Sequence, residues 1–379
     1  MRILHLRLEN WKNFRKVDIP LRRRAFVVGP NASGKSNLLD AIRFLQDLAA
    51  VSGGLQKAVL SRGGVSKIRC LAARMHSDIA FQIELGLEAE SPQWRYRIVF
   101  NQDNLRRPII REEVVCRDGA QLLARPDEQD SVDPERLTQT YLEQVNTNRG
   151  FREIAEFLGT VKYLHIVPQL IRDTERYLGR SKDPFGSDFL EQVARTSNRT
   201  RDARLKRIGE ALKVAVPQLS EIELFRDERG TPHMRGKYEH WRPRGAWQGE
   251  DQFSDGTLRL LGLLWAVLDG TGPLLLEEPE LSLHPAVVKY IPQMLWRAAR
   301  KSGRQILLST HSVELLADPG IAADEVLMLS PTRNGTEVMV AATQRDVAEL
   351  LKAGISISDI VMPRIAPKNP QQLSLFETV

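Results

Sequence analysis

The chain has 379 residues, 42% of them hydrophobic, which is enough for two or three structural units with apolar cores. Its two cysteines, Cys70 and Cys116, lie far apart and form no C-x-x-C pair, so neither a disulfide framework nor a cysteine zinc site is expected, and a reducing compartment fits. The formal net charge of +6 is compatible with nucleic-acid binding, but equally with an ordinary solvated surface.

The first half of the sequence is predicted to contain two opening strands, one helix and an antiparallel sheet. Charges scattered through the opening residues MRILHLRLENWKNF exclude a signal peptide, and alternating apolar residues predict strands instead. In chain order the predicted elements are a strand, turn and strand within 3–21, a strand at 25–28 that ends in a glycine-rich turn, a helix at about 36–49, a Gly- and Ser-rich loop at 51–66, and an antiparallel sheet over about 68–124 with period-two patterning.

The second half is predicted to contain a helical region and then a second α/β section. The predicted elements are a polar loop at 126–150, a mostly helical stretch at about 151–215, a strand pair around 220–240, helices at 256–269 and 285–300, and strands at 273–277, 304–309, 324–329 and 336–341. From about residue 354 the tail is polar and contains prolines, so an extended tail is expected. The longest uninterrupted apolar stretch, Leu260 to Leu268, is far shorter than the roughly 20 residues that span a bilayer, so we expect a soluble, cytoplasmic protein without a membrane partner.

A phosphate-binding motif follows the predicted strand at 25–28. Residues 29–36, GPNASGKS, fit G-x-x-x-x-G-K-[ST], in which glycines let successive backbone N–H groups face a phosphate. Lys35 would reach the β- and γ-phosphates, the Ser36 hydroxyl would bind Mg²⁺, and the N-terminus of the following helix favours an anion. We therefore expect ATP and Mg²⁺ as cofactors, with the nucleotide bound by Gly29, Asn31, Ala32, Ser33, Gly34, Lys35, Ser36 and Asn37.

Two later strands end in residues that would complete this site. The apolar run 274–276 leads into Glu277 and Glu278, of which the first would hold the Mg²⁺ shell and the second would orient or deprotonate the attacking water. His311 follows the strand run 306–310, and we expect it beside the γ-phosphate because ligands bind at the carboxyl ends of parallel strands. The predicted catalytic residues are therefore Lys35, Glu278 and His311.

Together these motifs resemble the ABC-type ATPases of the SMC/RecF-like branch and its OLD-like relatives, over residues 1–50 and 250–345. The opening LRLENWKNFRKVDI resembles that branch's first strands, in which a residue of the Asn-Phe turn lies near the adenine. Residues 254–257, SDGT, resemble the signature motif, and residues 281–285, LSLHP, resemble the D-loop. The resemblance implies that Ser254 and Gly256 of one subunit contact the γ-phosphate at the P-loop of another, so that ATP closes a head-to-tail homodimer or higher oligomer.

Two residues depart from the usual pattern of that family. Glu277 stands where most ABC proteins have Asp, and Asp255 replaces a signature glycine and adds a negative charge near the γ-phosphate. Signatures like SDGT occur in the OLD-like branch, so neither departure predicts an inactive site. Gln169 is the candidate for the glutamine of the Q-loop, which would bind the metal; the alternative is an ordinary surface glutamine.

The fold class implied is α/β, a P-loop NTPase of the ABC ATPase type with an antiparallel β section and a helical insert lobe. The predicted domains are an N-terminal ATPase half (1–125), a mostly helical lobe (126–250), a C-terminal ATPase half (251–345), and a C-terminal helix with an extended tail (346–379). About 240 residues separate the two nucleotide motifs, which argues against compact AAA+ and GTPase domains. The sequence lacks the sustained heptads of an SMC arm and the C-x-x-C motif of a zinc hook, so neither is expected. The residues after 345 are too few for the nuclease domain of OLD proteins, so we expect no nuclease in the same chain.

The preferred interpretation is an ATPase that acts on or senses DNA, in DNA repair or anti-phage defence, together with a separately encoded nuclease or other effector. The alternatives are the nucleotide-binding subunit of an ABC transporter and an ATP-gated scaffold with little turnover. A basic helix is a candidate surface for DNA, with an ordinary solvated helix face as the alternative; its basic residues are Arg195, Arg199, Arg201, Arg204, Lys206, Arg207 and Lys213.

The last motif lies near the C-terminus, where residues 372–376, QLSLF, resemble the bacterial sliding-clamp-binding motif. Gln372 would supply a polar anchor, while Leu373, Leu375 and Phe376 would enter an apolar groove of the clamp. The alternative is that Leu375 and Phe376 pin the tail onto the protein's own surface or onto its dimer mate.

Overall fold

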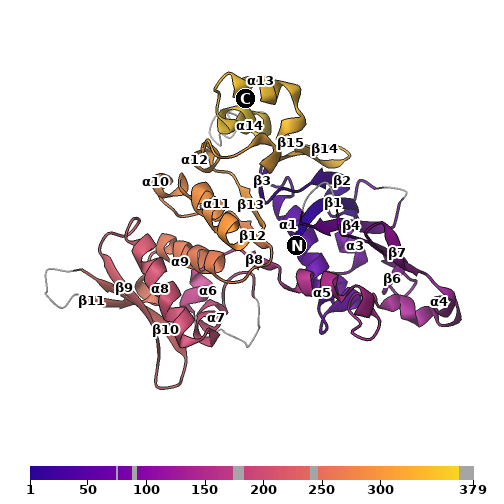
Figure 1. The fold of residues 1–379 in the computed structure, drawn as a ribbon, viewed down its shortest axis with the longest axis horizontal. Coiled ribbons are helices and arrows are strands. Elements are labelled where there is room, and N and C mark those ends of the chain that lie inside the picture. Colours follow the sequence, from indigo (N-terminus) through magenta and orange to yellow (C-terminus); the bar gives the residue numbers. More distant parts are fainter. Residues whose placement is uncertain (74–75, 88–91, 174–182, 240–245, 367–379) are drawn as a thin grey trace, which may run out of the picture. The chain divides into compact units, whose positions relative to one another are not determined.

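The structure is a computed structural model that describes residues 1–73, 76–87, 92–173, 183–239 and 246–366. It divides into two compact units (Figure 1). The first unit comprises Met1–Val161 and Ser309–Val379, and the second unit comprises Lys162–Leu308. The proposed clamp-binding motif at 372–376 lies outside the described residues.

A six-stranded antiparallel sheet dominates the first unit, with the order β2-β1-β4-β5-β6-β7. Its strands are β1 (Arg2–Trp11), β2 (Phe14–Pro20), β4 (Ile79–Gly86), β5 (Trp94–Gln102), β6 (Pro108–Arg117) and β7 (Ala120–Arg125). Alternate side chains are buried on one face, as in β5, where Trp94, Tyr96 and Ile98 are almost inaccessible. The opening strand–turn–strand and the antiparallel sheet predicted from the period-two patterning are thereby confirmed.

Helix α1 (Lys35–Ala49) packs its apolar side against this sheet. Phe44 of α1 lies within 5.2 Å of Trp11 and 4.8 Å of Phe81, measured between ring centroids, and it also stacks on Phe100. Aromatic rings at these separations attract one another beyond the area that they bury. The start of α1, where the phosphate-binding motif lies, is therefore fixed by a rigid core.

A second set of strands in the first unit leads into that motif. Strand β3 (Arg24–Val28) is fully buried and runs parallel to β14 (Val326–Thr332), which forms an antiparallel hairpin with β15 (Gly335–Val340). Arg24 anchors the start of β3 through its guanidinium, which lies 2.6 Å from the Glu325 carboxylate. Strand β13 (Ile306–Thr310) begins in the second unit and ends in the first.

The remaining helices of the first unit correct three predictions, the first of which is the polar loop at 126–150, where a capped helix forms at Glu128–Val132. They are α2 (Gly54–Leu60), α3 (Val65–Ile68), α4 (Glu128–Val132), α5 (Arg152–Gly159), α12 (Val313–Leu316), α13 (Arg345–Lys352) and α14 (Ile357–Ile365). The loop predicted at 51–66 is wrong, because Leu55, Ala58 and Val59 recur at helical spacing and are buried in α2. The extended tail predicted from 354 is wrong over α14, whose first turn is capped by the Ser356 hydroxyl.

Over its described residues, the second unit contains a parallel strand pair, a small antiparallel sheet and six α-helices. The strands are β8 (Lys162–Leu164) paired with β12 (Leu274–Glu277), and the sheet β11-β10-β9 of β9 (Leu219–Arg226), β10 (Pro232–Tyr238) and β11 (Ala246–Gly249). The helices are α6 (Pro168–Arg172), α7 (Phe189–Arg195), α8 (Asn198–Leu212), α9 (Asp255–Leu268), α10 (Pro285–Val288) and α11 (Ile291–Ser302). The single helix predicted at 285–300 is wrong, because Pro292 lacks an N–H and starts a new helix at α11.

Helix α9 is the centre of the second unit. Most of its residues are buried, and it packs against α6, α8 and α11. A helix that is apolar on every side belongs in a core, which explains why its sequence contains the longest apolar stretch of the chain. Along the described ranges, no helix is both long and apolar enough to cross a membrane.

Candidate nucleotide site

The phosphate-binding motif forms the connection between β3 and α1. Its backbone enters the left-handed region at Ala32, with φ 61°, and at Gly34, with φ 99°. Gly34 is the N-cap of α1 and provides no side chain to cap it, and the first turn of α1 contains no acidic residue. A Cβ at Gly29 would lie 2.6 Å from Ser33 Oγ, so the close curl of the loop requires glycine there.

Lys35 and Ser33 give this loop the properties of an anion site. Lys35 is 6% exposed, and its ammonium donates to the carbonyl oxygens of Gly29 at 3.1 Å and Pro30 at 3.3 Å. Ser33 is completely buried, and its hydroxyl has no hydrogen-bond partner among the described residues. A buried ammonium, an unpartnered hydroxyl and a helix N-terminus without acidic neighbours fit a bound polyphosphate.

The other predicted residues of the first unit lie around the same connection or after β13. Asn31, Ala32 and Ser36 are exposed, whereas the Asn37 amide donates to Asn13 Oδ1 at 2.8 Å. His311 directly follows the last residue of β13 and is half-buried. The next residue caps α12 with its hydroxyl, which fixes the direction of the chain immediately after His311.

The paired carboxylates of the second unit lie at the end of β12. Glu277 accepts a hydrogen bond from the Tyr163 hydroxyl of the neighbouring strand β8. Glu278 has φ 44°, a left-handed conformation that is uncommon for a residue other than glycine. Strained backbone of this kind gathers at functional sites, so the sharp turn at Glu278 is consistent with a role that needs an exact side-chain direction.

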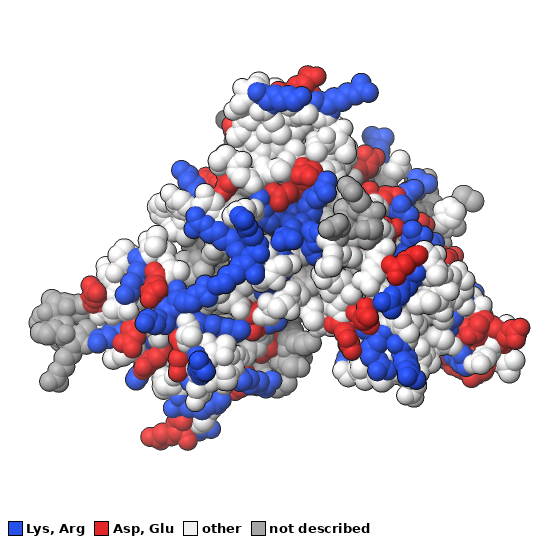
Figure 2. Space-filling model, viewed as in Figure 1, with Lys and Arg blue, Asp and Glu red and all other residues white. Residues whose placement is uncertain are grey.

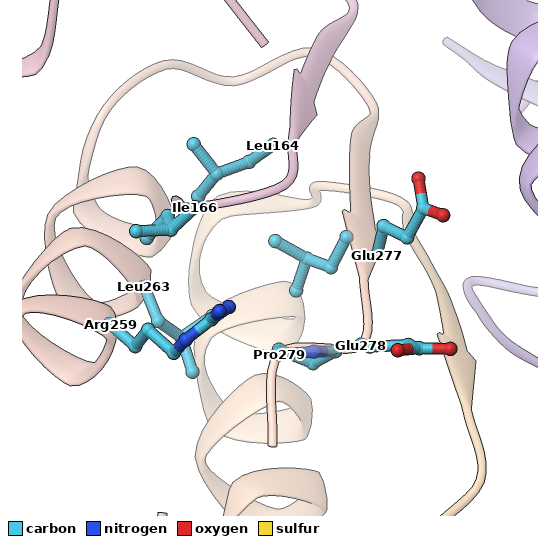
Figure 3. Close-up of a pocket in the computed structure, with 8 residues that line it drawn as sticks. Leu164, Ile166, Arg259, Leu263, Glu277, Glu278 and Pro279 are labelled. Carbon is cyan, nitrogen blue, oxygen red and sulfur yellow. The ribbon is translucent and has the colours of Figure 1, made fainter. Parts of the chain in front are cut away.

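A hollow lies behind these carboxylates (Figure 3). Its walls include Leu164, Ile166 and Leu263, and the Arg259 guanidinium projects into it from α9. Burial lowers the pKa of Arg259 from its ordinary value, against the opposing attraction of Asp255 and Glu278. The Arg259 Nε has no hydrogen-bond partner in the described part of the chain, so this cation is held near the carboxylates by electrostatics rather than by a bond from Nε.

The predicted signature residues lie at the N-terminus of α9. Ser254 caps this helix, since its hydroxyl accepts from the Thr257 N–H at 3.1 Å. A Cβ at Gly256 would lie 2.6 Å from the Ser282 carbonyl oxygen, so the signature and the D-loop are in close contact. Gln169 is exposed on α6, and its amide donates to Asp255 at 3.4 Å.

Four residues near these motifs were not singled out from the sequence. The Arg172 guanidinium lies 2.7 Å from the Asp255 carboxylate and forms an ion pair with it, which neutralises the extra negative charge of the signature. No sequence motif marks Arg172 or Tyr163, because their partners Asp255 and Glu277 are distant in sequence. Arg259 follows the signature closely, and Asn13 belongs to the Asn-Phe turn, so these two could have been found from their motifs.

Comparison with known proteins gives one family and a fold. The family model described as "AAA domain, putative AbiEii toxin, Type IV TA system" matches residues 24–317. An SMC head solved with the C-winged helix domain of ScpA is similar with a TM-score of 0.56 and 16% identity, over 89% of this chain and 97% of that one. The Smc head from Pyrococcus furiosus, solved with an extended coiled coil and the C-terminal domain of ScpA, gives 0.54 and 14%, over 93% and 99%. No curated protein matches the sequence.

These similarities confirm the predicted fold class. The parallel and antiparallel sheets of the chain match SMC heads over nearly their whole length, so the fold is that of a P-loop ATPase head. At 14–16% identity the likeness concerns the fold alone.

Proposed function

The chain belongs to the AAA-domain family whose model matches residues 24–317, and from this premise we propose that it binds ATP with Mg²⁺ and hydrolyses ATP to ADP and phosphate. The observation that carries the proposal is the loop between β3 and α1. It combines a buried lysine, a serine hydroxyl without a hydrogen-bond partner in the described part of the chain, and glycines that leave no room for a Cβ. These are the features that a polyphosphate requires of its binding loop.

Each residue of the proposed site has a distinct role. The backbone of 29–37 and the Lys35 ammonium would bind the phosphates, while Ser36, Glu277 and Gln169 would hold the metal. Glu278 would orient the attacking water and accept its proton, and His311 would contact the γ-phosphate. Mg²⁺, when bound, neutralises charge on the phosphate oxygens.

The proposal includes a head-to-tail dimer in which a second copy completes the site with Ser254 and Gly256. Ser254 is exposed at the N-terminus of α9, where the helix dipole favours an anion. Arg172 neutralises Asp255 beside it, so the signature does not present an unpaired carboxylate to the γ-phosphate. Both features support a phosphate contact at this end of α9.

We include DNA as a partner, contacted through the basic helix α8. The single basic helix predicted over 195–213 is wrong, because Arg195 ends α7 and Lys213 follows α8, so α8 holds five of the seven basic residues. Arg199, Lys206 and Arg207 are exposed on α8, whereas Arg204 is bonded to Asp269 at 2.8 Å. Figure 2 shows Lys and Arg side chains gathered over the helices of the second unit. Exposed cations spaced along a helix suit a phosphate backbone, whose binding releases counterions.

The proposed setting is DNA repair or anti-phage defence with a separately encoded effector. The SMC heads of similar fold were solved with domains of ScpA, which supports a partner protein for a head of this kind. The family description names a toxin of type IV toxin–antitoxin systems, which supports a defence role. The four predicted domains and a cytoplasmic location stay part of the proposal.

A phosphate-release assay tests the proposed reaction. The wild-type protein should release phosphate from ATP, and Lys35→Ala should abolish the release because the variant lacks the phosphate-binding cation. Glu278→Gln should still bind ATP without hydrolysing it, and size-exclusion chromatography with ATP should show an accumulated dimer. Unchanged turnover in Glu278→Gln would exclude Glu278 as the base.

The same assay separates the alternatives. A scaffold would bind ATP with hardly any phosphate release. An ABC transporter subunit would hydrolyse ATP without stimulation by DNA, whereas the proposed function predicts a faster rate when duplex DNA is added.

A further inference from the structure

The side chain of Asn13, in the turn between β1 and β2, contacts three separate parts of the first unit. Its Nδ2 donates to the Ser33 carbonyl oxygen of the phosphate-binding loop at 2.7 Å and to Thr336 Oγ1 of the β14–β15 hairpin at 2.8 Å. Its Oδ1 accepts from Asn37 Nδ2 in the first turn of α1, also at 2.8 Å. Both donors of the amide and its acceptor are therefore bonded to protein groups.

The backbone on either side of Asn13 fits it closely. A Cβ at Gly34 would lie 2.0 Å from Asn13 Nδ2, and Gly34 has φ 99°. A Cβ at Gly335, the first residue of β15, would lie 2.8 Å from the Asn13 carbonyl oxygen, and Gly335 has φ 102°. That oxygen also accepts from the Thr336 N–H at 2.7 Å. Loop and hairpin thus meet at Asn13 through glycines that no larger residue could replace without strain.

The turn that carries Asn13 is itself fixed to α1. Trp11 Nε1 donates to the Asn37 carbonyl oxygen at 2.8 Å, and the Lys12 ammonium lies 2.7 Å from Asp40. Burial alone would raise the pKa of Asp40, but Arg62 and Lys12 hold it below its usual value, so the ion pair persists at neutral pH. Asn13 is therefore presented to the loop by a turn with little freedom to move.

The bond to the Ser33 carbonyl has a direct consequence for the loop. A trans peptide is planar, and its C=O and N–H point in opposite directions. Because Asn13 holds the Ser33 oxygen, the Gly34 N–H must point away from Asn13. Inward-facing N–H groups are what a phosphate-binding loop offers its ligand, so the orientation of this peptide matters for binding.

We propose that Asn13 is a positioning residue that sets the Ser33–Gly34 peptide for phosphate binding and links the loop to the β14–β15 hairpin. The inference rests on the proposed nucleotide-binding function. Binding of a phosphate to the loop would then restrain the hydrogen bond between Asn13 and Thr336. Through β15 it would also restrain the helices α13 and α14, which follow β15 in the chain.

Nucleotide affinity tests the positioning role. With a fluorescent ATP analogue and Mg²⁺, Asn13→Ala should raise the Kd about tenfold, which corresponds to about 1.4 kcal/mol. Asn13→Asp should bind more weakly still, because it loses both donors and adds a negative charge beside the loop. Asn101→Ala is the matched control: Asn101 is a β5 asparagine that donates to Ser77 and Asp78, and its removal should leave the Kd unchanged.

Hydrogen exchange tests the link to the hairpin. Nucleotide should slow exchange of the Thr336 amide in the wild-type protein but not in Asn13→Ala. Thr336→Val should raise the Kd by less than Asn13→Ala, and the double variant should bind no more weakly than Asn13→Ala, because both changes interrupt the same contact.

The outcomes also separate this inference from the proposed function. A wild-type protein that binds no nucleotide would overturn both. If the wild type binds and Lys35→Ala does not, an unchanged Kd in Asn13→Ala overturns only the role of Asn13, and a lower melting temperature at unchanged Kd does the same, since it shows a merely structural contact.

Discussion

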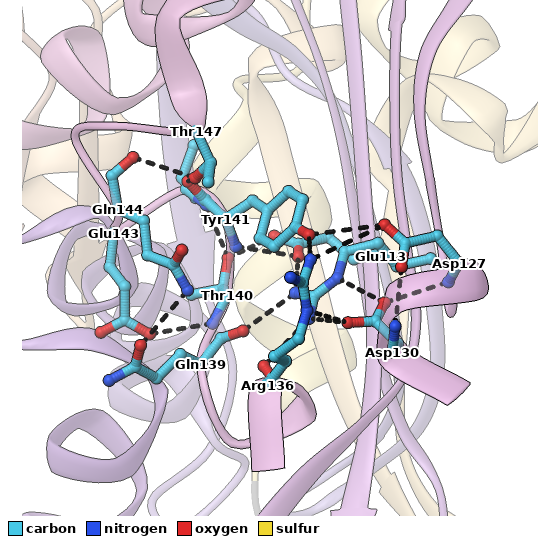
Figure 4. Close-up of polar contacts among 12 residues, drawn as sticks. Glu113, Asp127, Asp130, Arg136, Gln139, Thr140, Tyr141, Glu143, Gln144 and Thr147 are labelled. Atoms are coloured by element: carbon cyan, nitrogen blue, oxygen red, sulfur yellow. Dashed lines mark hydrogen bonds and ion pairs between the residues drawn. The ribbon is translucent and has the colours of Figure 1, made fainter. Parts of the chain in front are cut away.

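A cluster of polar side chains in the first unit includes Glu113, Asp130 and Arg136 (Figure 4). Arg125 forms ion pairs with the two carboxylates of this cluster. The side chains of Arg125, Glu113 and Asp130 are all completely buried. Arg125 donates to Asp130 at 2.8 and 2.9 Å, to Glu113 at 3.1 Å, and to the carbonyl oxygens of Arg136 and Gln139 at 2.9 Å. All five N–H donors of the guanidinium are therefore bonded, and the cluster joins β6 and β7 to the segment after α4.

Replacing Arg125 with Met tests how much this cluster stabilises the first unit. Methionine is of similar length but leaves the buried Glu113 without its cation and leaves Asp130 with Arg136 alone, at 3.1 Å. Removing one partner of a buried ion pair destabilises by about 3–5 kcal/mol, a large part of the roughly 5–15 kcal/mol that holds a domain folded. Glu113 would keep its bonds from Tyr96 and Thr140, which places the expected loss nearer the lower figure.

Urea denaturation at two pH values measures the effect. In the wild-type protein burial alone would raise the pKa of Asp130, but hydrogen bonds from Arg125 and Arg136 hold it well below its usual range. A carboxyl with a lowered folded pKa contributes stability above its unfolded pKa of about 4 and loses it as the pH falls. In Arg125→Met the pKa of Asp130 should rise, so the deficit should be fully present at neutral pH and shrink as the pH falls below about 4.

The control variant is Arg107→Met, because Arg107 is partly exposed and pairs with the exposed Glu135. Exposed ion pairs are screened by water, so this variant should unfold close to the wild-type midpoint. A loss below about 1 kcal/mol in Arg125→Met, with no dependence on pH, would refute the argument that the buried cluster is held together by its cation.

Two further predictions concern partners. Reversing Arg199, Lys206 and Arg207 to Glu should weaken duplex DNA binding and flatten its dependence on salt while basal ATP hydrolysis is unchanged; unaltered affinity would exclude α8 as the surface, and Arg204 is left in place because it is bonded to Asp269. Deleting residues 371–379 should abolish pull-down with a bacterial sliding clamp and leave ATP hydrolysis intact, whereas a tail that binds no clamp but whose loss lowers the melting temperature would favour the pinned alternative.

Local patterns in the sequence were sufficient for much of the fold. Helix α1 was predicted from Ser36 and begins at Lys35, because its buried positions recur at helical spacing and a glycine turn precedes it. The loop predicted at 51–66 was wrong because its glycines mark the ends of helices. Glycine and serine at 51–66 suggested a loop, yet Gly53 is the N-cap of α2, Gly63 lies in the turn that follows α2, and Gly64 is the N-cap of α3. Composition alone does not distinguish a glycine that ends a helix from one in a loop.

In the candidate site, too, local motifs could be predicted from the sequence and long-range contacts could not. The phosphate-binding loop is a continuous segment, and its residue spacing alone predicts its chemistry. From the sequence, Asp255 could be recognised only as a departure from the usual signature glycine. Its neutralising partner, Arg172, is distant in sequence. Gln169 and Asp255 are separated by 86 residues, and Arg172 reaches the same carboxylate from the same helix α6. Sequence spacing carries no information about such a pair, since it depends on how α6 packs against α9. Once Arg172 is taken into account, the SDGT signature carries no uncompensated charge, and a glycine is no longer needed at position 255 for the helix end to accept an anion.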